Sequence, residues 1–124
     1  MIIGVGCDIT DFSIAEKLGW NSNQKILNRI FSKREIESYH KLGKLTYLTG
    51  RFAVKESVLK CLGTGMYDGI SLNEIEIIQQ KSGKPQIILK GEVKKLSLDL
   101  GINKWFVSIT HSSNCSMAYV IAES

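Results

Sequence analysis

The stretch KLTYLTGRFAVKESVLKCLG, residues 44–63, decides the fold of this chain. Its large apolar residues recur at the spacing of one helix face, and they are Leu45, Leu48, Phe52 and Leu59. The pattern predicts a helix over Lys44–Leu62, and Gly63 is a suitable stop at its carboxyl end. This is the longest helical pattern in the chain, so we expect the other elements to pack against it.

Strands and helices are mixed on both sides of this helix, without a regular βαβ alternation. The predicted strands are Ile2–Asp8, Glu74–Gln80, Gln86–Lys90, Trp105–Thr110 and Ser116–Ile121. The predicted shorter helices are Phe12–Gly19, Asn23–Phe31 with a cap at Asn21 or Ser22, Ser32–Lys41 with a capping box, and Glu92–Leu100. The order predicts an α+β fold, in which a small antiparallel sheet packs with one long and several short helices.

The composition is that of one globular domain spanning residues 1–124. Hydrophobic residues make up 44% and charged residues 23%, with one proline and 11 glycines, which excludes collagen-like and proline-rich disordered classes. No apolar run approaches the length of a membrane helix, and the first residues do not resemble a signal peptide. The three cysteines form no CxxC pair, so we expect a reducing cytoplasmic location.

The net charge is +4, and the whole excess lies in residues 1–62. A localised basic excess fits an anionic partner, which could be a nucleic acid, an acidic protein surface or a phosphate-rich small molecule. Composition does not choose among these three classes.

Glu56 is the residue that fits the long helix least well. It falls within the apolar stripe, one turn after Phe52, and an unpaired buried carboxylate costs several kcal/mol. One interpretation is an internal salt bridge to Arg51, Lys55 or Lys60; the other is a metal ligand or a general base.

Asp8 is a second unexpected carboxylate, at the end of a strand whose same face carries Gly4 and Gly6. Glycines within a strand mark a close approach by a ligand or by another backbone. Asp8 could simply end the strand in a turn. Alternatively, Asp8 and Glu56 meet at one site, where two carboxylates suit Mg²⁺.

Two further features suggest phosphate binding, each with an ordinary alternative. Lys60, Gly63, Thr64 and Gly65 place a cation, a hydroxyl and flexible backbone at a helix end, although a simple helix cap has the same appearance. His111, between a strand and a loop, suits phosphate contact or proton transfer, or it is a structural loop residue.

In this order, these residues carry a resemblance to a known family. The segments that match are residues 3–9 (IGVGCDI), 51–65 (RFAVKESVLKCLGTG), 71–77, 82–85 (SGKP) and 108–112 (SITHS). Over about Ile2–Ala122 the chain resembles the holo-(acyl-carrier-protein) synthases, the small bacterial 4′-phosphopantetheinyl transferases. The resemblance implies transfer of the phosphopantetheine arm of coenzyme A to a serine of apo-acyl carrier protein, which supports fatty acid synthesis and releases adenosine 3′,5′-bisphosphate.

The resemblance also implies a role for each matching residue. Asp8 and Glu56 would hold Mg²⁺ with the coenzyme A pyrophosphate, and Glu56 would accept the serine proton directly or through a metal-bound water. The residues implied at the coenzyme A phosphates and nucleotide are Lys60, Gly63, Thr64, Gly65, Arg51, Lys84, Pro85 and His111, with Lys55 as a further candidate. The family forms homotrimers with active sites at subunit boundaries.

One position departs from the family pattern. The first helix of the family usually carries a basic residue that docks the acidic carrier, and here the matching residue is Ile14. Lys17, Lys25 and Arg29 remain nearby and could substitute for it, and Phe12 adds a further apolar side chain. The departure predicts docking that depends more on apolar contacts and is less sensitive to salt.

Two other functions compete with the transferase. The charge excess alone would suit a non-catalytic basic module that binds RNA or an acidic protein, although the basic and aromatic residues are not interleaved as in a nucleic-acid surface. A ligand-binding paralogue that has lost activity would retain the fold. The presence of Asp8, Glu56, Lys60 and His111 argues against that second alternative.

Overall fold

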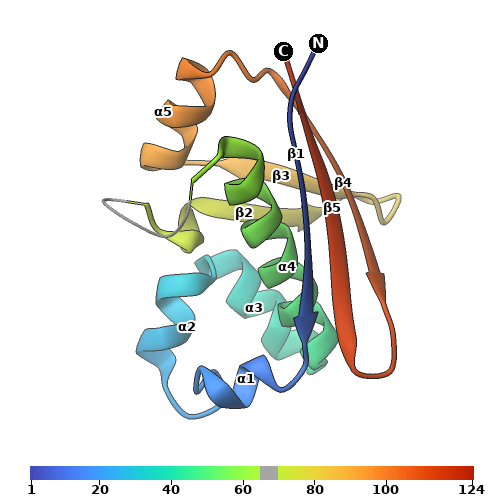
Figure 1. Ribbon diagram of the computed structural model, residues 1–124. Helices are drawn as coiled ribbons and strands as arrows, with labels where there is room; N and C mark the ends of the chain where they lie inside the picture. The colour runs from blue at the N-terminus through green and yellow to red at the C-terminus, as the bar shows by residue number, and fades with distance from the viewer. Residues whose placement is uncertain (65–69) are drawn as a thin grey trace.

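The computed structural model describes residues 1–64 and 70–124. Its centre is helix α4 (Leu45–Leu62), which packs against an antiparallel sheet of three strands in the order β1-β5-β4 (Figure 1). These strands are β1 (Ile2–Asp11), β5 (Cys115–Glu123) and β4 (Lys104–His111). Gly63 ends α4 in the left-handed conformation, with φ of 70°, so the predicted helix and its stop are confirmed.

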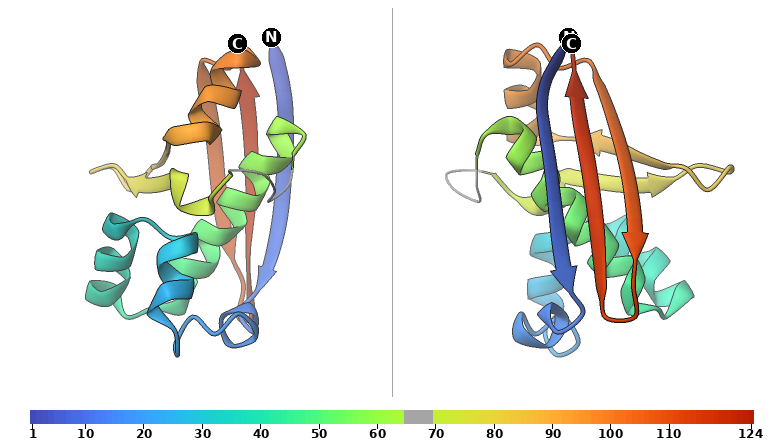
Figure 2. Two further views of the ribbon diagram at one scale, coloured as in Figure 1. Left: turned by 90° about the vertical axis from the view of Figure 1, so that its left-hand side faces the viewer. Right: turned by 45° about the vertical axis from the view of Figure 1, so that its right-hand side comes forward.

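A second sheet pairs β2 (Ile75–Gln79) with β3 (Pro85–Leu89) across the turn at residues 81–84. The remaining helical elements are α1 (Ile14–Lys17), α2 (Gln24–Ile30), α3 (Lys33–Leu42), the 3₁₀ turn η1 (Leu72–Glu74) and α5 (Gly91–Asp99). The predicted α+β fold is confirmed, with the strands divided between two sheets. The helices cover one face of the three-stranded sheet (Figure 2).

The predicted helix starts are confirmed at one helix and corrected at another. At α3, the Ser32 hydroxyl accepts from the Glu35 amide, and the Glu35 carboxylate accepts from the Ser32 amide at 2.9 Å, which is the expected capping box. At α2 the cap is Asn23 rather than Asn21 or Ser22. The helix begins only at Gln24, so Asn23 is the residue whose side chain reaches the first free amides.

Two glycines bring β1 directly against α4. A Cβ atom on Gly4 would clash with the carbonyl oxygen of Cys61, and one on Gly6 would clash with that of Ser57. The predicted close approach at these glycines is therefore made by the backbone of α4. Because side chains alternate along a strand, Asp8 lies on this same face, next to the carboxyl half of the helix.

Lys55 lies in the interior, and the expectation that it serves a ligand phosphate is wrong. Its side chain is 0% exposed, and its Nζ donates to Glu35 Oε1 at 2.7 Å and to the carbonyl oxygens of Leu72 and Ile75. The other Glu35 oxygen accepts from the Ile77 amide at 3.0 Å. This ion pair joins α3, α4 and β2, so Lys55 is a structural residue.

Candidate active site

Asp8 and Lys60 form one cluster at the contact between β1 and α4. Lys60 Nζ lies 3.3 Å from Asp8 Oδ1 and donates to the Cys7 carbonyl oxygen at 2.7 Å. The second Asp8 oxygen accepts from the Thr10 hydroxyl at 3.0 Å. The Asp8 side chain is 19% exposed and that of Lys60 is 53% exposed, so the cluster opens to solvent.

Glu56 adds a second carboxylate to this cluster, one helical turn before Lys60. Burial raises the pKa of Glu56, the negative charge of Asp8 raises it further, and Lys60 opposes both effects. Of the three cations considered as partners for Glu56, Lys60 is therefore the one whose charge reaches it. Among residues 1–64 and 70–124, none forms a hydrogen bond with the Glu56 carboxylate.

The surroundings of Glu56 differ from the expected apolar stripe. Helix α4 is buried on nearly every side, because β1, β5, β4, β2 and α3 all pack against it. Glu56 is instead half-buried, between half-buried Phe52 and exposed Lys60. It lies at the edge of the core, where a ligand can reach it.

The donors at this cluster fit Mg²⁺. Two carboxylates supply the hard oxygen ligands that this ion prefers, and Mg²⁺ usually keeps waters or substrate phosphates as its other ligands. A second cation would also relieve the repulsion that raises the pKa of Glu56. The described residues contain no cluster of three or more metal-binding side chains, so an ion here would depend on water or phosphate for the rest of its ligands.

Gly63 and Thr64 follow Lys60 within one turn, at the end of α4. The amides of Gly63 and Thr64 donate to the carbonyl oxygens of Lys60 and Leu59 at 3.1 and 3.0 Å, which closes the helix. Gly65, the third residue implied in this loop, lies outside the described residues.

Arg51, Pro85 and His111 come together in a separate cavity of about 240 Å³. Gly83 also lines it, whereas Lys84, between Gly83 and Pro85, is exposed and is not part of the lining. Helix α4, the start of β3 and the end of β4 thus bring together three of the residues implied at coenzyme A, which are Arg51, Pro85 and His111. The remaining lining residues, none of which was predicted as a binding residue, are Gln79, Val107, Ser108 and Ile109.

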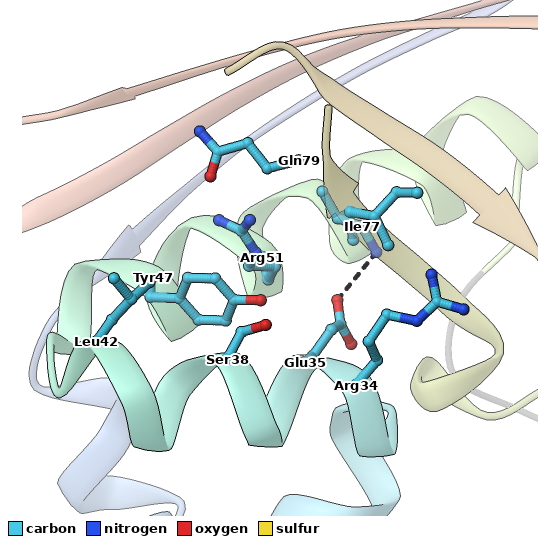
Figure 3. Close-up of a pocket in the computed structure, with 9 residues that line it drawn as sticks. Arg34, Glu35, Ser38, Leu42, Tyr47, Arg51, Ile77 and Gln79 are labelled. Atoms are coloured by element: carbon cyan, nitrogen blue, oxygen red, sulfur yellow. Dashed lines mark hydrogen bonds between the residues drawn. The ribbon is translucent and has the colours of Figure 1, made fainter. Parts of the chain in front are cut away.

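Arg51 is buried without a carboxylate partner among the described residues. Its side chain is 8% exposed, its guanidinium carbon lies 3.7 Å from the centroid of the Tyr47 ring, and its Nε has no hydrogen-bond partner. Figure 3 shows Arg51 beside Tyr47 in an adjoining cavity of about 290 Å³. A buried guanidinium left this way is suited to an anionic ligand. The sequence had not identified Tyr47, although its position one turn before Arg51 is the spacing of stacked helical side chains.

His111 is held by hydroxyl groups that the sequence did not single out. Its Nδ1 lies 2.7 Å from Ser116 Oγ, and Ser116 Oγ lies 2.8 Å from Thr49 Oγ1. Ser116 is on β5 and Thr49 is on α4, 67 residues apart in the chain, so no local pattern could have connected them.

The two groups of residues face different sides of α4. Arg51 and Glu56 are five positions apart, which separates their directions by about 140° around a helix axis. Asp8, Glu56 and Lys60 are on the β1 side, and Arg51, Pro85 and His111 are on the side of β3 and β4. One chain therefore presents two separate groups of candidate residues, a candidate metal half-site at Asp8, Glu56 and Lys60 and a candidate nucleotide half-site at Arg51, Pro85 and His111.

Comparisons with known proteins find similarity along nearly the whole chain. A family model described as the 4′-phosphopantetheinyl transferase superfamily matches residues 4–122. A holo-(acyl-carrier-protein) synthase of Geotalea daltonii is 36% identical over 99% of both chains. Solved structures of the synthases from Neisseria meningitidis and from Helicobacter pylori in complex with coenzyme A are 30% and 28% identical. The Neisseria meningitidis structure has a TM-score of 0.90 and covers 100% of both chains. The Helicobacter pylori structure has a TM-score of 0.82 and covers 96% of this chain and 99% of that one.

The predicted fold, family resemblance and transferase class are confirmed by these findings. None of the matches is confined to one segment, since each includes β1, α4 and the β4–β5 pair. The chain belongs to the 4′-phosphopantetheinyl transferase superfamily.

Proposed function

We propose that this chain transfers the 4′-phosphopantetheine group of coenzyme A to a serine of apo-acyl carrier protein, as a single domain spanning residues 1–124. The reaction releases adenosine 3′,5′-bisphosphate and, we propose, serves fatty acid synthesis. The names of its relatives support the carrier substrate, and a relative bound to coenzyme A supports the donor. The observation that carries the proposal is the half-buried pair Asp8 and Glu56. The negative charge of Asp8 raises the pKa of Glu56, so a bound cation would stabilise the two charged carboxylates.

In the proposed reaction, Asp8 and Glu56 hold Mg²⁺ at the coenzyme A pyrophosphate. The ion supplies charge neutralisation at the phosphates. Lys60, one turn after Glu56, contributes a second positive charge there, and Gly63 and Thr64 follow it at the end of α4. Because neighbouring positive charge stabilises the transferring phosphoryl group, these residues favour the transition state.

Glu56 accepts the proton of the attacking serine. The serine oxygen forms a bond to the β-phosphorus as the bond to the bridging pyrophosphate oxygen breaks, and adenosine 3′,5′-bisphosphate carries away that oxygen. Burial favours the protonated form of Glu56, which helps this carboxylate to accept the proton.

Arg51, Pro85 and His111 bind the nucleotide end, including its 3′-phosphate, with Lys84 at the rim. Arg51 faces away from Glu56 around the axis of α4, and Pro85 and His111 lie on the Arg51 side. We therefore propose that the neighbouring copy of the chain supplies these three residues. A homotrimer with cyclic symmetry brings the nucleotide half-site of one copy to the metal half-site of the next.

The exposed face of the three-stranded sheet supports self-association. This outer face is the side of β1, β5 and β4 away from α4, and its apolar side chains are 43–67% exposed: Val5, Ile9, Phe106, Met117 and Tyr119. The strand register places Ile9 opposite Met117, so the patch is continuous across β1 and β5. Contiguous exposed apolar surface of this kind marks a protein–protein contact.

The acidic carrier docks, we propose, near α1 and α2. Ile14 is half-buried against the core, which limits the apolar contact that it can offer. Lys17, Lys25 and Arg29 are exposed on these two helices and provide the basic surface. We therefore propose that these cations replace the missing basic residue at position 14.

We also propose that the protein works in the cytoplasm. Its three cysteines are free, as expected in a reducing compartment. In the described part of the chain, no helix has both the length and the apolar character needed to cross a membrane.

The direct test is transfer from coenzyme A to a purified bacterial apo-carrier, followed by mass spectrometry of the carrier. We expect the carrier serine to gain the mass of one phosphopantetheine group, only with Mg²⁺ present. No gain on any carrier tested would contradict the proposal. Salt-sensitive RNA binding without transfer would instead favour the non-catalytic binding module.

A further inference from the structure

We propose that Thr49 and Ser116 fix the ring of His111 with a proton on Nδ1, so that Nε2 is the nitrogen presented to the nucleotide phosphate. The proposal rests on the nucleotide-binding role proposed above for His111. Thr49 and Ser116 are positioning residues, since they act on the ligand only through the imidazole.

The three side chains form a continuous line of hydrogen bonds from α4 to the cavity. Thr49 and Ser116 are both 0% exposed, so no bulk water competes for their hydroxyl groups. The line runs from His111 Nδ1 to Ser116 Oγ at 2.7 Å and from there to Thr49 Oγ1 at 2.8 Å. Its far end is closed by backbone carbonyl oxygens, because Thr49 Oγ1 lies 3.2 Å from that of Leu45 and 3.3 Å from that of Thr46.

The direction of these bonds follows from counting protons. A carbonyl oxygen only accepts, so the single hydroxyl proton of Thr49 is directed to Leu45 or Thr46. Thr49 must then accept the proton of Ser116, which leaves Ser116 Oγ as an acceptor toward the ring. In the arrangement that we propose, His111 Nδ1 is therefore the donor. If the hydrogen bonds ran in the opposite direction, the lone pairs of the Thr49 oxygen would face carbonyl oxygens where no water is present, which is unfavourable.

Gly50 leaves space for the His111 ring at this position. A Cβ atom at residue 50 would lie 3.0 Å from Cε1 of His111 and 3.3 Å from Cγ2 of Ile109. The ring therefore packs against the backbone of α4, beside the cavity that His111 shares with Arg51 and Pro85. Nδ1 is occupied by Ser116, and no described residue bonds Nε2, so Nε2 is the nitrogen left for a ligand.

This arrangement serves an anionic ligand. With Nδ1 already a donor, a proton added at Nε2 makes the ring a cation that donates to Ser116 and to a phosphate oxygen together. Such a bond to a charged acceptor is stronger than a neutral one. A ring free to choose its tautomer, or to rotate, would bind the phosphate less often in the right geometry.

The test is nitrogen NMR of the imidazole rings in the protein without ligand, at a pH where both rings are neutral. The chain has two histidines, and exposed His40 serves as the internal control. We expect His111 to carry its proton on Nδ1 and His40 to show the Nε2–H form usual in water. In Thr49→Val, the Ser116 proton is released toward Nδ1 and His111 shifts to the Nε2–H form, while Thr49→Ser keeps the wild-type spectrum.

Kinetics provide the second reading. We expect Thr49→Val to raise the KM for coenzyme A about tenfold with kcat unchanged, and to leave the KM for 3′-dephospho-coenzyme A unaltered. An Nε2–H ring in the wild type, or no shift in Thr49→Val, would overturn the proposal. A shifted tautomer with an unaltered KM would overturn the role in phosphate binding. Absence of transfer by the wild type would contradict the proposed function alone, because the NMR reading needs no substrate.

Discussion

Lys55 and Glu56 are neighbours on α4, yet their charges are compensated in opposite ways. Lys55 is completely buried and donates three hydrogen bonds, one of them to the Glu35 carboxylate at 2.7 Å. Glu56 is half-buried, and its pKa is raised by burial and by the charge of a second carboxylate, Asp8, which Lys60 only partly offsets. A charge whose partners are all internal holds the fold together, whereas a charge that lacks compensation marks the place where a ligand must supply it.

The largest expected effect comes from removing Lys55, whose charge is compensated within the protein. Lys55→Met leaves the Glu35 carboxylate buried without its cation, and we expect the free energy of unfolding to fall by about 3–5 kcal/mol. Urea denaturation measures this. Lys60→Met is the matched control, since its half-exposed pair with Asp8 should contribute about 1 kcal/mol or less. Adding Glu35→Gln to Lys55→Met should recover part of the loss. Equal destabilisation by Lys55→Met and Lys60→Met would show that the buried pair is not special.

The second largest effect comes from removing the charge of Glu56. Glu56→Gln keeps the size of the side chain but removes its charge and basicity. We expect transfer to an apo-carrier to fall at least about 100-fold, with the protein still folded. Exposed Glu37→Gln on α3 is the control and should retain full activity. Wild-type rates in Glu56→Gln would remove Glu56 from the chemistry.

The smallest effect is the pH dependence of stability without Mg²⁺. The folded-state pKa of Glu56 is raised, so the folded protein binds its proton more tightly than the unfolded chain does. The wild type therefore loses stability relative to Glu56→Gln as pH rises from the ordinary value of 4.5 through the raised pKa. We expect Glu56→Gln to be more stable at neutral pH, by on the order of 1 kcal/mol or less, and the two to converge near pH 4.

Thermal unfolding at several pH values, with and without Mg²⁺, measures this difference. Added Mg²⁺ should stabilise the wild type and not Glu56→Gln, because binding to the folded state alone shifts the unfolding equilibrium. A wild type that is more stable than Glu56→Gln at neutral pH without Mg²⁺ would show that Glu56 is already compensated.

The sequence was sufficient to predict the features that depend on local spacing. Helical periodicity and Gly63 located α4, and the two glycines of β1 indicated the close contact that brings Asp8 to the same helix. The division of the strands into two sheets was not predictable, since strand pairing depends on contacts between distant parts of the chain.

The same reason explains why the roles of the lysines were not separable from the sequence. Lys55 and Lys60 both lie near Glu56 along the helix, but only the tertiary structure brings Glu35 to Lys55 and Asp8 to Lys60. The contact of Ser116 with Thr49, across 67 residues, escaped prediction for the same reason. Residue type and spacing identified the candidates, and long-range packing assigned their partners.

The central claim is that each active site combines a metal half-site with the nucleotide half-site of a neighbouring copy. The most direct measurement mixes two inactive variants, Glu56→Gln and Arg51→Met, by refolding them together. If neighbouring copies share each site in a cyclic oligomer, one site in four receives both intact halves, so about a quarter of wild-type transfer should return. If the mixture stays as inactive as its two components, although its subunits have exchanged, the site is built within one chain and the account is contradicted.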